Sequence, residues 1–335
     1  MNLNLVMKKA SLKDIAESLG VSKALVSLVL NDKGDERGIN RQTQERVRIK
    51  AKELNYIPNQ YARGLRIGRT NTIGVIVPDI SNMFYGKLCK SIEQEAYALG
   101  YNLIISNTYE DSQKEKKLIS DLINRNIDGL ILASSFDSKN EIDDLREDEF
   151  PLVLVDRVFE DFNVDSISVS NKEGATKAIE FLYSKGFKKP VCFTISPVYI
   201  SSITERIKGY LGALHNQLDA KLFQIPHNNI DEGVANSMSE LKNQDFDSVF
   251  CVNNTIAKSI LKFLAHAGNE GFENLKMISF DDSEIFDIVN PKISSISQPI
   301  EIIGKNAVSM LIDRFENPLD HKIQHLILDT VLIER

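Results

Sequence analysis

From Asn71 onward, the sequence alternates short apolar runs with longer stretches of helical periodicity, and this alternation limits the fold more than any other feature. The short runs are rich in β-branched residues: TIGVIV, NLIIS, DGLILAS, LVLVD, PVCFTI, SVFCVN and KMISFDD. Between them, apolar residues recur at helical spacing over 84–99, 111–125, 173–185, 205–215, 231–241 and 255–267. Alternating helices and fully apolar strands predict parallel sheets covered by helices on both faces.

The length of this region predicts two such sheets. It spans 71–335, which is large for one doubly wound sheet. In folds of this class, ligands bind at the carboxyl ends of the strands. We therefore expect two subdomains whose strand ends face each other across a ligand-binding cleft.

The first 70 residues differ from the rest in charge. They hold fourteen Lys and Arg against seven Asp and Glu, whereas the whole chain has a formal charge of −7. The remainder therefore carries −14. A basic end on an acidic body is typical of a polyanion-binding head, and a solvated lysine-rich tail is the alternative. Because the basic residues alternate with apolar ones, the pattern favours the head.

Two short helices joined by a glycine are predicted within this basic end. Ser11 is placed to cap the start of the first helix, Asp14 puts its charge near the positive helix end, and Gly20 ends the helix. Ser22 then opens a second helix, which gives the spacing of a helix-turn-helix. A third helix, rich in Arg and Lys, is expected over 42–55. Spacing alone would also suit another three-helix bundle.

The amino-acid identities in these segments are more specific than the spacing of the helices. SLKDIAESLGVSKALVSLVLN, followed by ERVRIKAKELNYIPNQYARGLR, resembles the headpiece of the lactose-repressor/galactose-repressor (LacI/GalR) family. In the body, IGVIVPDISNMFY, DGLIL, VDR, ERIKGY, CVNN, SFDD and SISQP occur in that family's order. The resemblance implies an all-α helix-turn-helix headpiece joined to an α/β periplasmic-binding-protein-like body with two doubly wound parallel-sheet subdomains.

The resemblance also implies domain boundaries. The headpiece is expected over 1–57, a hinge helix or linker over 58–70, and the effector-binding domain over 71–335. Three crossovers would divide the last of these between an N-terminal subdomain and a C-terminal subdomain. The N-terminal subdomain is expected at about 71–169 and 299–325, and the C-terminal subdomain at about 170–298 and 326–335.

In the resembled family the second helix enters the major groove of DNA. The positions expected to face DNA here are Ser22, Lys23, Ala24, Ser27 and Leu28. Lys23 can reach guanine acceptors or a phosphate, Ala24 can make only apolar contact, and the serines can bind phosphates. Leu28 stands where the family often has a basic residue, and packing against the bundle is its alternative role.

The loop NDKGDERGIN is longer than usual for the family. Because its acidic residues would repel phosphates, we expect it to point away from the DNA backbone.

The hinge resembles a segment that becomes helical on operator DNA in this family. Leu65 matches a leucine that is inserted into the minor groove, and Ala62 matches the small residue behind it. Asn59 begins the segment, and Arg66 can neutralise a phosphate. A plain basic linker, with Leu65 packed on the core, is the alternative.

The resemblance places the effector site at strand ends. The expected ligand-binding residues are Phe84, Tyr85, Asp156, Arg206, Asn253 and Asp281. Carboxylates, an amide and a guanidinium can together satisfy adjacent sugar hydroxyls, and the aromatic rings can form an apolar wall. Both charged residues also have a purely structural alternative. Asp281 would only cap a helix, and Arg206, at the opening of its helix, would only form a surface ion pair.

The sequence offers little support for catalysis. It contains no G-x-G-x-x-G, G-x-x-x-x-G-K-[ST], H-E-x-x-H or G-x-S-x-G pattern, and its five histidines have no metal-ligand spacing. Its three cysteines lie far apart in apolar stretches, which predicts buried thiols. We therefore expect no enzyme, no cofactor and no bound metal.

The same features predict where the protein acts. No apolar run approaches the roughly 20 residues that span a bilayer, and the first ten residues lack the order of a secretory signal. We expect a cytoplasmic, nucleoid-associated protein with no membrane contact. An exported sugar-binding transport protein would share the architecture of the body, but it would lack the basic head.

The resemblance favours a repressor of carbohydrate-utilisation genes whose operator binding responds to a sugar or sugar derivative. A non-sugar corepressor such as a purine is the alternative. A symmetric operator implies a two-fold dimer. HLILDTVLIER predicts a final strand, and because no apolar heptad follows it, we expect a homodimer.

Overall fold

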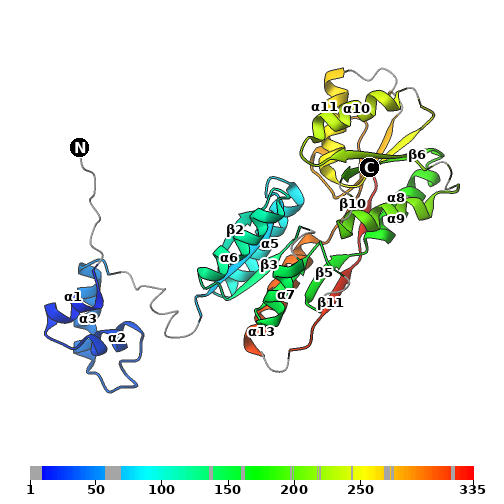
Figure 1. The fold of residues 1–335 in the computed structure, drawn as a ribbon. Coiled ribbons are helices and arrows are strands. Elements are labelled where there is room, and N and C mark those ends of the chain that lie inside the picture. The colour runs from blue at the N-terminus through cyan, green and yellow to red at the C-terminus, as the bar shows by residue number, and fades with distance from the viewer. Residues whose placement is uncertain are drawn as a thin grey trace. The chain divides into compact units, whose positions relative to one another are not determined.

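The chain divides into two compact units, Met1–Thr70 and Asn71–Arg335 (Figure 1). The structure is a computed structural model. It describes residues 10–56, 69–135, 139–159, 163–196, 198, 200–216, 218, 220–242, 244–267, 272, 275–317 and 321–335. The expected hinge residues Asn59, Ala62, Leu65 and Arg66 lie outside these ranges.

The headpiece, residues 10–56 of the first unit, is a three-helix bundle. Its helices are α1 (Leu12–Leu19), α2 (Lys23–Leu30) and α3 (Arg41–Glu53). They enclose a small apolar core of Ile15, Ala16, Val26, Val29, Val47 and Ala51. The sequence thus predicted all three helices, although α3 ends two residues earlier than expected.

Side-chain caps define the helix-turn-helix. Ser11 and Asp14 form a capping box, in which the Ser11 amide donates to Asp14 Oδ2 at 2.7 Å and the Asp14 amide donates to Ser11 Oγ at 3.3 Å. Gly20 ends α1 with a φ of 65°, a left-handed conformation that glycine adopts without strain. The Ser22 hydroxyl then caps α2 by accepting the Leu25 amide.

The acidic loop between α2 and α3 folds back on α3. The buried Gln44 amide donates to Asp35 Oδ1 and to the Ile39 carbonyl, both at 2.8 Å. Arg48 donates to Asp32 Oδ1 at 2.9 Å. Two of the loop's acids are therefore engaged by α3.

The body contains two six-stranded sheets, one in each subdomain. The first has the order β11-β5-β4-β3-β1-β2 and the second β12-β10-β9-β8-β6-β7. The strands of the first sheet are β1 (Thr72–Val77), β2 (Asn102–Asn107), β3 (Gly129–Leu132), β4 (Leu152–Val155), β5 (Asp165–Val169) and β11 (His325–Leu328). Those of the second are β6 (Pro190–Ser196), β7 (Leu222–Pro226), β8 (Ser248–Cys251), β9 (Lys276–Phe280), β10 (Ser294–Ser297) and β12 (Val331–Ile333). All neighbouring strands are parallel except β10 and β12, which are antiparallel.

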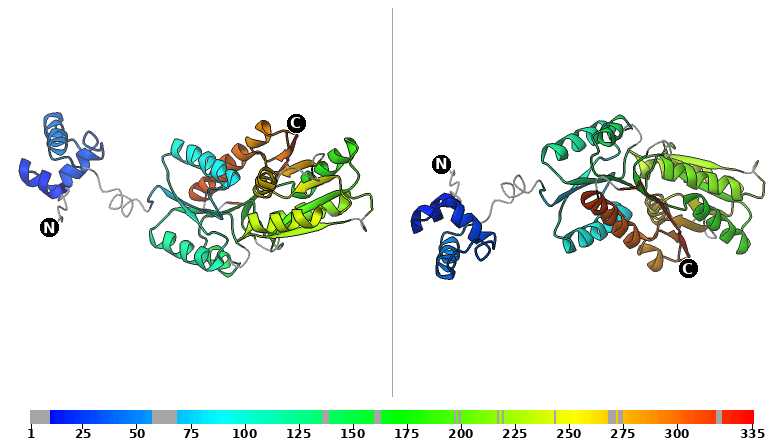
Figure 2. Two further views of the ribbon diagram at one scale, coloured as in Figure 1. Left: turned by 90° about the horizontal axis from the view of Figure 1, so that it is seen from above. Right: turned by 90° about the horizontal axis from the view of Figure 1, so that it is seen from below.

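Helices cover both faces of each sheet (Figure 2). On the first sheet, α5 (Met83–Ala98) and α13 (Ile300–Glu316) share one face, whereas α6 (Ser112–Asn124) and α7 (Lys139–Glu147) pack on the other. The second sheet has α8 (Asn171–Ser184) and α9 (Ser201–Ala213) on one face, with α10 (Ile230–Leu241) and α11 (Asn254–Ala267) on the other. A short helix, α12 (Ile285–Ile288), precedes β10. This is the doubly wound architecture that the alternation predicts.

The chain crosses between the subdomains three times: after β5, after β10 and after β11. The predicted boundary between 325 and 326 is wrong, because it falls inside β11, which pairs with β5 in the first sheet over His325–Leu328. HLILDTVLIER is therefore two strands, with the crossover at 329–330 between them. Tertiary pairing divides an apolar run that the sequence suggested was one strand.

Burial explains which strands the sequence revealed. The central strands β3, β4 and β8 are buried along their whole length, and their apolar runs stand out. The edge strand β7 alternates buried and exposed residues, and β5 carries polar residues. Apolar runs alone predict neither of the last two. No helix among the described residues is long and apolar enough to cross a membrane.

Candidate functional site

The two subdomains enclose a cavity of about 470 Å³, called here the cleft pocket. All six residues predicted to bind the effector line it: Phe84, Tyr85, Asp156, Arg206, Asn253 and Asp281. They come from α5, α9 and the carboxyl ends of β4, β8 and β9. The structure thus brings together side chains that lie up to about 200 residues apart in the sequence.

Arg206 is the central cation of the cleft pocket and is only 3% exposed. Its Nε donates to Asn171 Oδ1 at 2.8 Å, and its Nη1 donates to the Val252 carbonyl at 2.9 Å. Its guanidinium carbon lies 3.7 Å from the centroid of the Phe280 ring. The prediction that Arg206 opens its helix is wrong, because α9 begins at Ser201. Arg206 lies in the second turn, where the packing of α9 holds it in the interior.

Two buried aspartates flank this guanidinium, one from each subdomain. Asp281 Oδ2 lies 3.5 Å from Arg206 Nη1, and Asp156 Oδ1 lies 3.9 Å from Arg206 Nη2. Burial raises the pKa of Asp281, while Arg206 and the Gln298 amide, which donates to Asp281 Oδ1 at 2.6 Å, oppose this. The described helix that follows, α12, has Glu284 at its N-cap, and the Asp281 side chain faces Arg206 and Gln298 instead.

Asp156 and Asp281 occupy equivalent positions in the two subdomains. Each follows a central strand with a left-handed backbone, at φ of 63° and 65° respectively. Each also donates its amide to the neighbouring strand at 2.9 Å, to Ile167 and Ile296. Non-glycine residues seldom adopt this conformation, which costs free energy and is concentrated at functional sites.

Tyr85 fixes one oxygen of Asp156. The Tyr85 hydroxyl donates to Asp156 Oδ2 at 2.8 Å, and its ring packs edge-on against Phe84. Burial raises the pKa of Tyr85 well above its usual value, so the phenol remains a donor. Asp156 Oδ1 has no hydrogen-bond partner, although the residue is only 7% exposed. A buried acceptor without a donor is costly, and a ligand hydroxyl would satisfy it.

Arg157 and Glu110 form an ion pair in the pocket wall that the sequence reasoning did not single out. Two nitrogens of Arg157, Nη1 and Nη2, each donate to a different Glu110 oxygen at 2.6 Å. Burial opposes the charge of Arg157, but the carboxylates of Glu110 and Asp156 raise its pKa above the usual value. The VDR motif, where Arg157 follows Asp156, could have identified Arg157, but no local sequence pattern pairs Arg157 with Glu110.

Asn253 combines a structural and a pocket-lining role. Its Oδ1 accepts the amide of Ile256 at 3.0 Å in the first turn of α11, so it caps that helix. It also lines the cleft pocket and is 8% exposed. The side chain therefore helps fix the start of α11 at the site.

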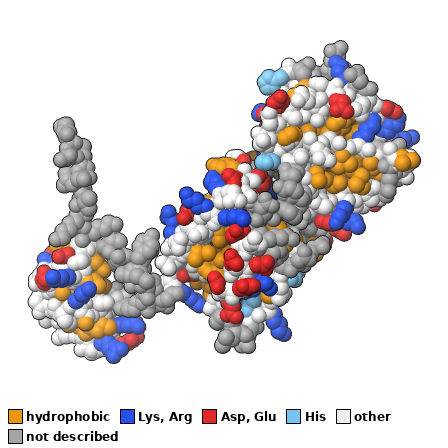
Figure 3. Space-filling view, viewed as in Figure 1, with side chains coloured by type: hydrophobic (Ala, Val, Ile, Leu, Met, Phe, Trp, Pro, Cys, Tyr) orange, Lys and Arg blue, Asp and Glu red, His pale blue; other side chains and the backbone are white. Residues whose placement is uncertain are grey.

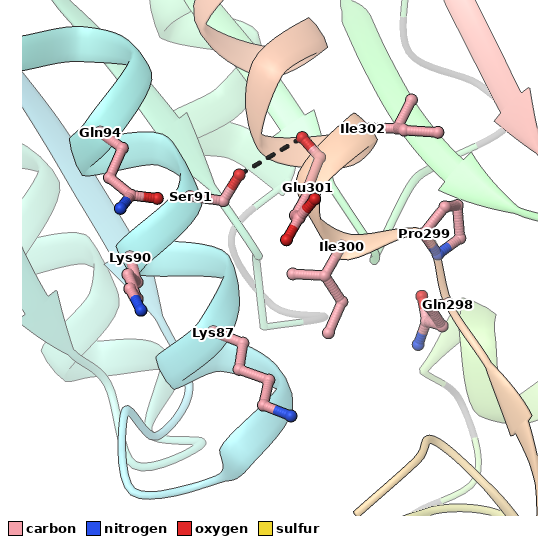
Figure 4. A pocket seen from close by; sticks show the side chains of 9 residues that line it. All are labelled: Lys87, Lys90, Ser91, Gln94, Gln298, Pro299, Ile300, Glu301 and Ile302. Carbon is pink, nitrogen blue, oxygen red and sulfur yellow. Dashed lines mark hydrogen bonds between the residues drawn. The ribbon is translucent and has the colours of Figure 1, made fainter. Parts of the chain in front are cut away.

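A second cavity, of about 490 Å³, lies between α5 and the start of α13 (Figure 4). Ser91 Oγ donates to the Glu301 carbonyl at 3.3 Å across it, and Lys87 and Lys90 line its α5 side. Gln298 lines this cavity and donates to Asp281, so one side chain links it to the cleft pocket.

On the headpiece, α2 presents the residues predicted to face DNA. Ser22, Lys23 and Ala24 are exposed, and Ser27 and Leu28 are half-buried. Leu28 is not among the described side chains that pack against the headpiece core. Ser22 already caps α2 through its hydroxyl. Lys and Arg side chains are visible on the headpiece surface in Figure 3.

Two family models match the chain in the same order as its structural units. Residues 11–59 match "Bacterial regulatory proteins, lacI family", and residues 70–330 match "Periplasmic binding proteins and sugar binding domain of LacI family". The chain belongs to the lacI family of bacterial regulatory proteins. Membership makes it a DNA-binding transcription regulator rather than an enzyme, as the sequence motifs predicted.

Two relatives match this lacI-family chain almost from end to end, and a solved structure matches most of it. Catabolite control protein A of Staphylococcus epidermidis is 30% identical over 93% of this chain and 97% of its own length. The ribose operon repressor of Halalkalibacterium halodurans is 30% identical over 92% of each. A LacI family transcriptional regulator from Enterococcus faecium, solved with bound ribose, has a TM-score of 0.71 and 25% identity over 79% of this chain and 97% of its own.

Proposed function

We propose that this regulator is a repressor of carbohydrate-utilisation genes, acting as a homodimer in the cytoplasm at operator DNA on the nucleoid. Residues 1–57 are the DNA-binding headpiece, 58–70 the hinge and 71–335 the effector-binding domain. A sugar or sugar derivative in the cleft pocket modulates operator binding. The ribose operon relative and the ribose-bound structure support a carbohydrate effector.

One observation carries the effector assignment. Within a cavity of about 470 Å³, the buried Asp156 Oδ1 has no hydrogen-bond partner and lies beside Arg206 and Asp281. Such acceptors and donors at short spacing suit adjacent hydroxyls. The six pocket residues predicted from the sequence are accordingly proposed as effector contacts.

At the headpiece, α2 is proposed as the recognition helix. Lys23 and Ala24, exposed at its start, contact base edges, whereas Ser22 and Ser27 contact phosphates and Leu28 makes apolar contact. In the hinge, Leu65 with Ala62 is proposed as the minor-groove wedge, and Asn59 and Arg66 as its polar flanks. A non-sugar corepressor such as a purine remains the alternative effector, and it would strengthen operator binding.

The test combines effector binding and operator binding in the full-length protein. An operator duplex is first selected from genomic fragments, and sugars are then titrated by calorimetry into wild type and Asp156→Asn. Because hydrogen bonds to charged groups contribute about 1.5–3 kcal/mol, Asp156→Asn should weaken sugar binding by roughly 10- to 150-fold. It should leave operator binding without sugar unchanged.

Asp245→Asn is the matched control, since Asp245 is exposed, pairs with Lys189 and lies outside the cleft pocket. It should bind sugar as wild type does. Equal sugar affinity in wild type and Asp156→Asn would contradict the proposed site. Binding of a purine that strengthens operator binding, with no sugar bound, would instead establish the corepressor alternative.

A further inference from the structure

We propose that the cleft pocket takes an uncharged polyol and rejects sugar phosphates and sugar acids, with Glu110 as the residue that sets this preference. The inference rests on the proposed function, because it names the ligand class for the same pocket. The inference concerns the net charge of the ligand, because a sugar and its phosphate ester or acid share most of their hydroxyl groups and differ in charge.

The first reason is that Glu110 already occupies the guanidinium of Arg157. Paired N–H groups of a guanidinium form the fork that best recognises a phosphate or carboxylate. In this structure Nη1 and Nη2 of Arg157 each donate to Glu110 at 2.6 Å. Arg157 Nε is buried without a hydrogen-bond partner. A single N–H suits one hydroxyl oxygen, whereas an anion would have to displace Glu110.

The guanidinium of Arg206 is also occupied by groups of the protein. Nε and Nη1 donate to Asn171 and to the Val252 carbonyl, and two carboxylates lie within 4 Å of the guanidinium. Displacing a buried carboxylate from its cation leaves an unpaired buried charge, which is strongly unfavourable. An anionic ligand therefore cannot use Arg206 without this cost.

The charge balance of the lining points in the same direction. Among the described lining residues, the carboxylates are Asp79, Glu110, Asp156 and Asp281, and the Lys and Arg are Arg157, Arg206 and Lys258. Acids therefore outnumber these bases by one. Burial and the neighbouring Lys87 lower the pKa of Lys258. A ligand phosphate or carboxylate would add charge of the sign already in excess.

The pocket atoms left without hydrogen-bond partners fit a polyol. Asp156 Oδ1 is an acceptor and Arg157 Nε is a donor; both are buried, and both belong to adjacent residues. Tyr85 holds the other Asp156 oxygen at 2.8 Å, so this carboxylate offers one acceptor in a fixed direction. A hydroxyl that donates to Asp156 and a neighbouring oxygen that accepts from Arg157 would satisfy both without bringing a net charge.

The experiment compares matched ligands on the full-length protein. The probes are ribose, xylose, glucose and fructose, each with its phosphate ester, together with ribonate and gluconate. Affinities for wild type, Glu110→Gln and Glu141→Gln are measured by thermal shift and calorimetry. Glu141→Gln is the control, because it removes a paired acid of the same subdomain that does not line the pocket.

Wild type is expected to bind at least one free sugar at least tenfold more tightly than its phosphate or acid. Glu110→Gln frees the Arg157 fork, so its preference should shift by roughly tenfold or more toward the anionic member of the pair, as expected for a charged hydrogen bond. Glu141→Gln should leave the preference unchanged. Glu110→Asn is a second variant, since Glu110 has a φ of 61° and asparagine tolerates that conformation.

The failures are distinguishable. Tighter binding of a phosphate or acid to wild type overturns the inference and leaves a carbohydrate effector in place. A free sugar that binds wild type, with no shift in either Glu110 variant, overturns the role of Glu110. If no free or charged sugar binds wild type, the proposed carbohydrate effector fails, and the inference fails with it.

Discussion

At the residue scale, the cleft pocket depends on a few side chains held in costly conformations. Asp156 and Asp281 both have a left-handed backbone, and both are buried next to Arg206. Burying three charged groups is favourable only when they are paired and hydrogen-bonded. A Tyr85 hydrogen bond to Asp156 and a Gln298 hydrogen bond to Asp281 provide part of this compensation. The pocket is therefore preformed at the cost of strain and desolvation.

The exposed end of α2 gives a prediction at the same scale. Lys23 is exposed at the first position of the helix. If it contacts a guanine, Lys23→Ala should cost about 1–3 kcal/mol and relax specificity at one base pair; if it contacts a phosphate, all sequences should weaken alike and the salt slope should fall by about 1. Both are measured by fluorescence anisotropy on operator and mutated operators.

Lys13→Ala is the control for Lys23. Lys13 lies on α1 and forms an exposed pair with Glu17 at 3.5 Å, and it is outside the predicted recognition surface. Its substitution should change operator affinity less than that of Lys23. An equal loss of operator affinity in the two variants would show that Lys23 is not part of the recognition surface.

At the scale of elements, Arg335 adds side-chain contacts to the backbone pairing of the last strand. Arg335 follows β12 and donates to Asp287 Oδ1 at 2.7 Å, and its Nη1 lies 2.9 Å from Asp282 Oδ1. Hydrogen bonds from Arg335 lower the pKa of Asp287. At Asp282, burial acts to raise the pKa, but hydrogen bonds from Ser295 and Arg335 act against it, and the pKa is lowered overall. The contacts join the residue that follows β12 to α12 and to the loop before it.

These shifts predict a pH dependence for the Arg335 contacts. Because both carboxyls have a lower pKa folded than unfolded, their contribution is complete above the unfolded value of about 3.9 and is lost as the pH falls through the folded values. Arg335→Gln should therefore lower Tm at pH 7 by about 2–4 °C. The difference from wild type should narrow below about pH 4.

Arg146→Gln provides the comparison, because Arg146 pairs with Asp143 within α7 and both side chains are more than 40% exposed. Exposed pairs contribute little to stability, so its Tm should match that of wild type. A Tm difference between Arg335→Gln and wild type that persists unchanged to pH 3 would show that lost packing, rather than lost ion pairs, lowers the Tm.

At the scale of the whole molecule, the charges of the two units differ in sign. The first 70 residues carry +7 and the rest −14, within a total of −7. A basic surface gains DNA affinity by releasing counterions from phosphates, while an acidic surface is repelled. In this chain the positive charge is concentrated in the unit that matches the DNA-binding family model.

This division predicts how operator binding responds to salt. The logarithm of affinity should fall linearly with the logarithm of salt concentration, with a slope of about −0.9 per phosphate neutralised. A chain lacking residues 1–70 should lose operator binding and keep sugar binding, as measured by anisotropy and calorimetry. Operator binding by the truncated chain at physiological salt would contradict the division.

The local features of the fold could be read directly from the sequence. Ser11, Asp14 and Gly20 predicted the ends of α1, because capping and left-handed backbone depend on residues within one turn. The buried central strands and their flanking helices followed from periodicity. Family motifs further indicated six residues that line the cleft pocket.

Only the tertiary structure decided which distant groups meet. Glu110 and Arg157 are 47 residues apart, and no local pattern pairs them. HLILDTVLIER becomes two strands because pairing to β5 and to β10 divides it between the sheets. Whether Arg206 lies at the surface or in the interior depends on the packing of α9, not on its neighbours in sequence. Sequence determines the elements and their caps through short-range interactions, whereas charge pairing and sheet membership depend on contacts that exist only after the chain has folded.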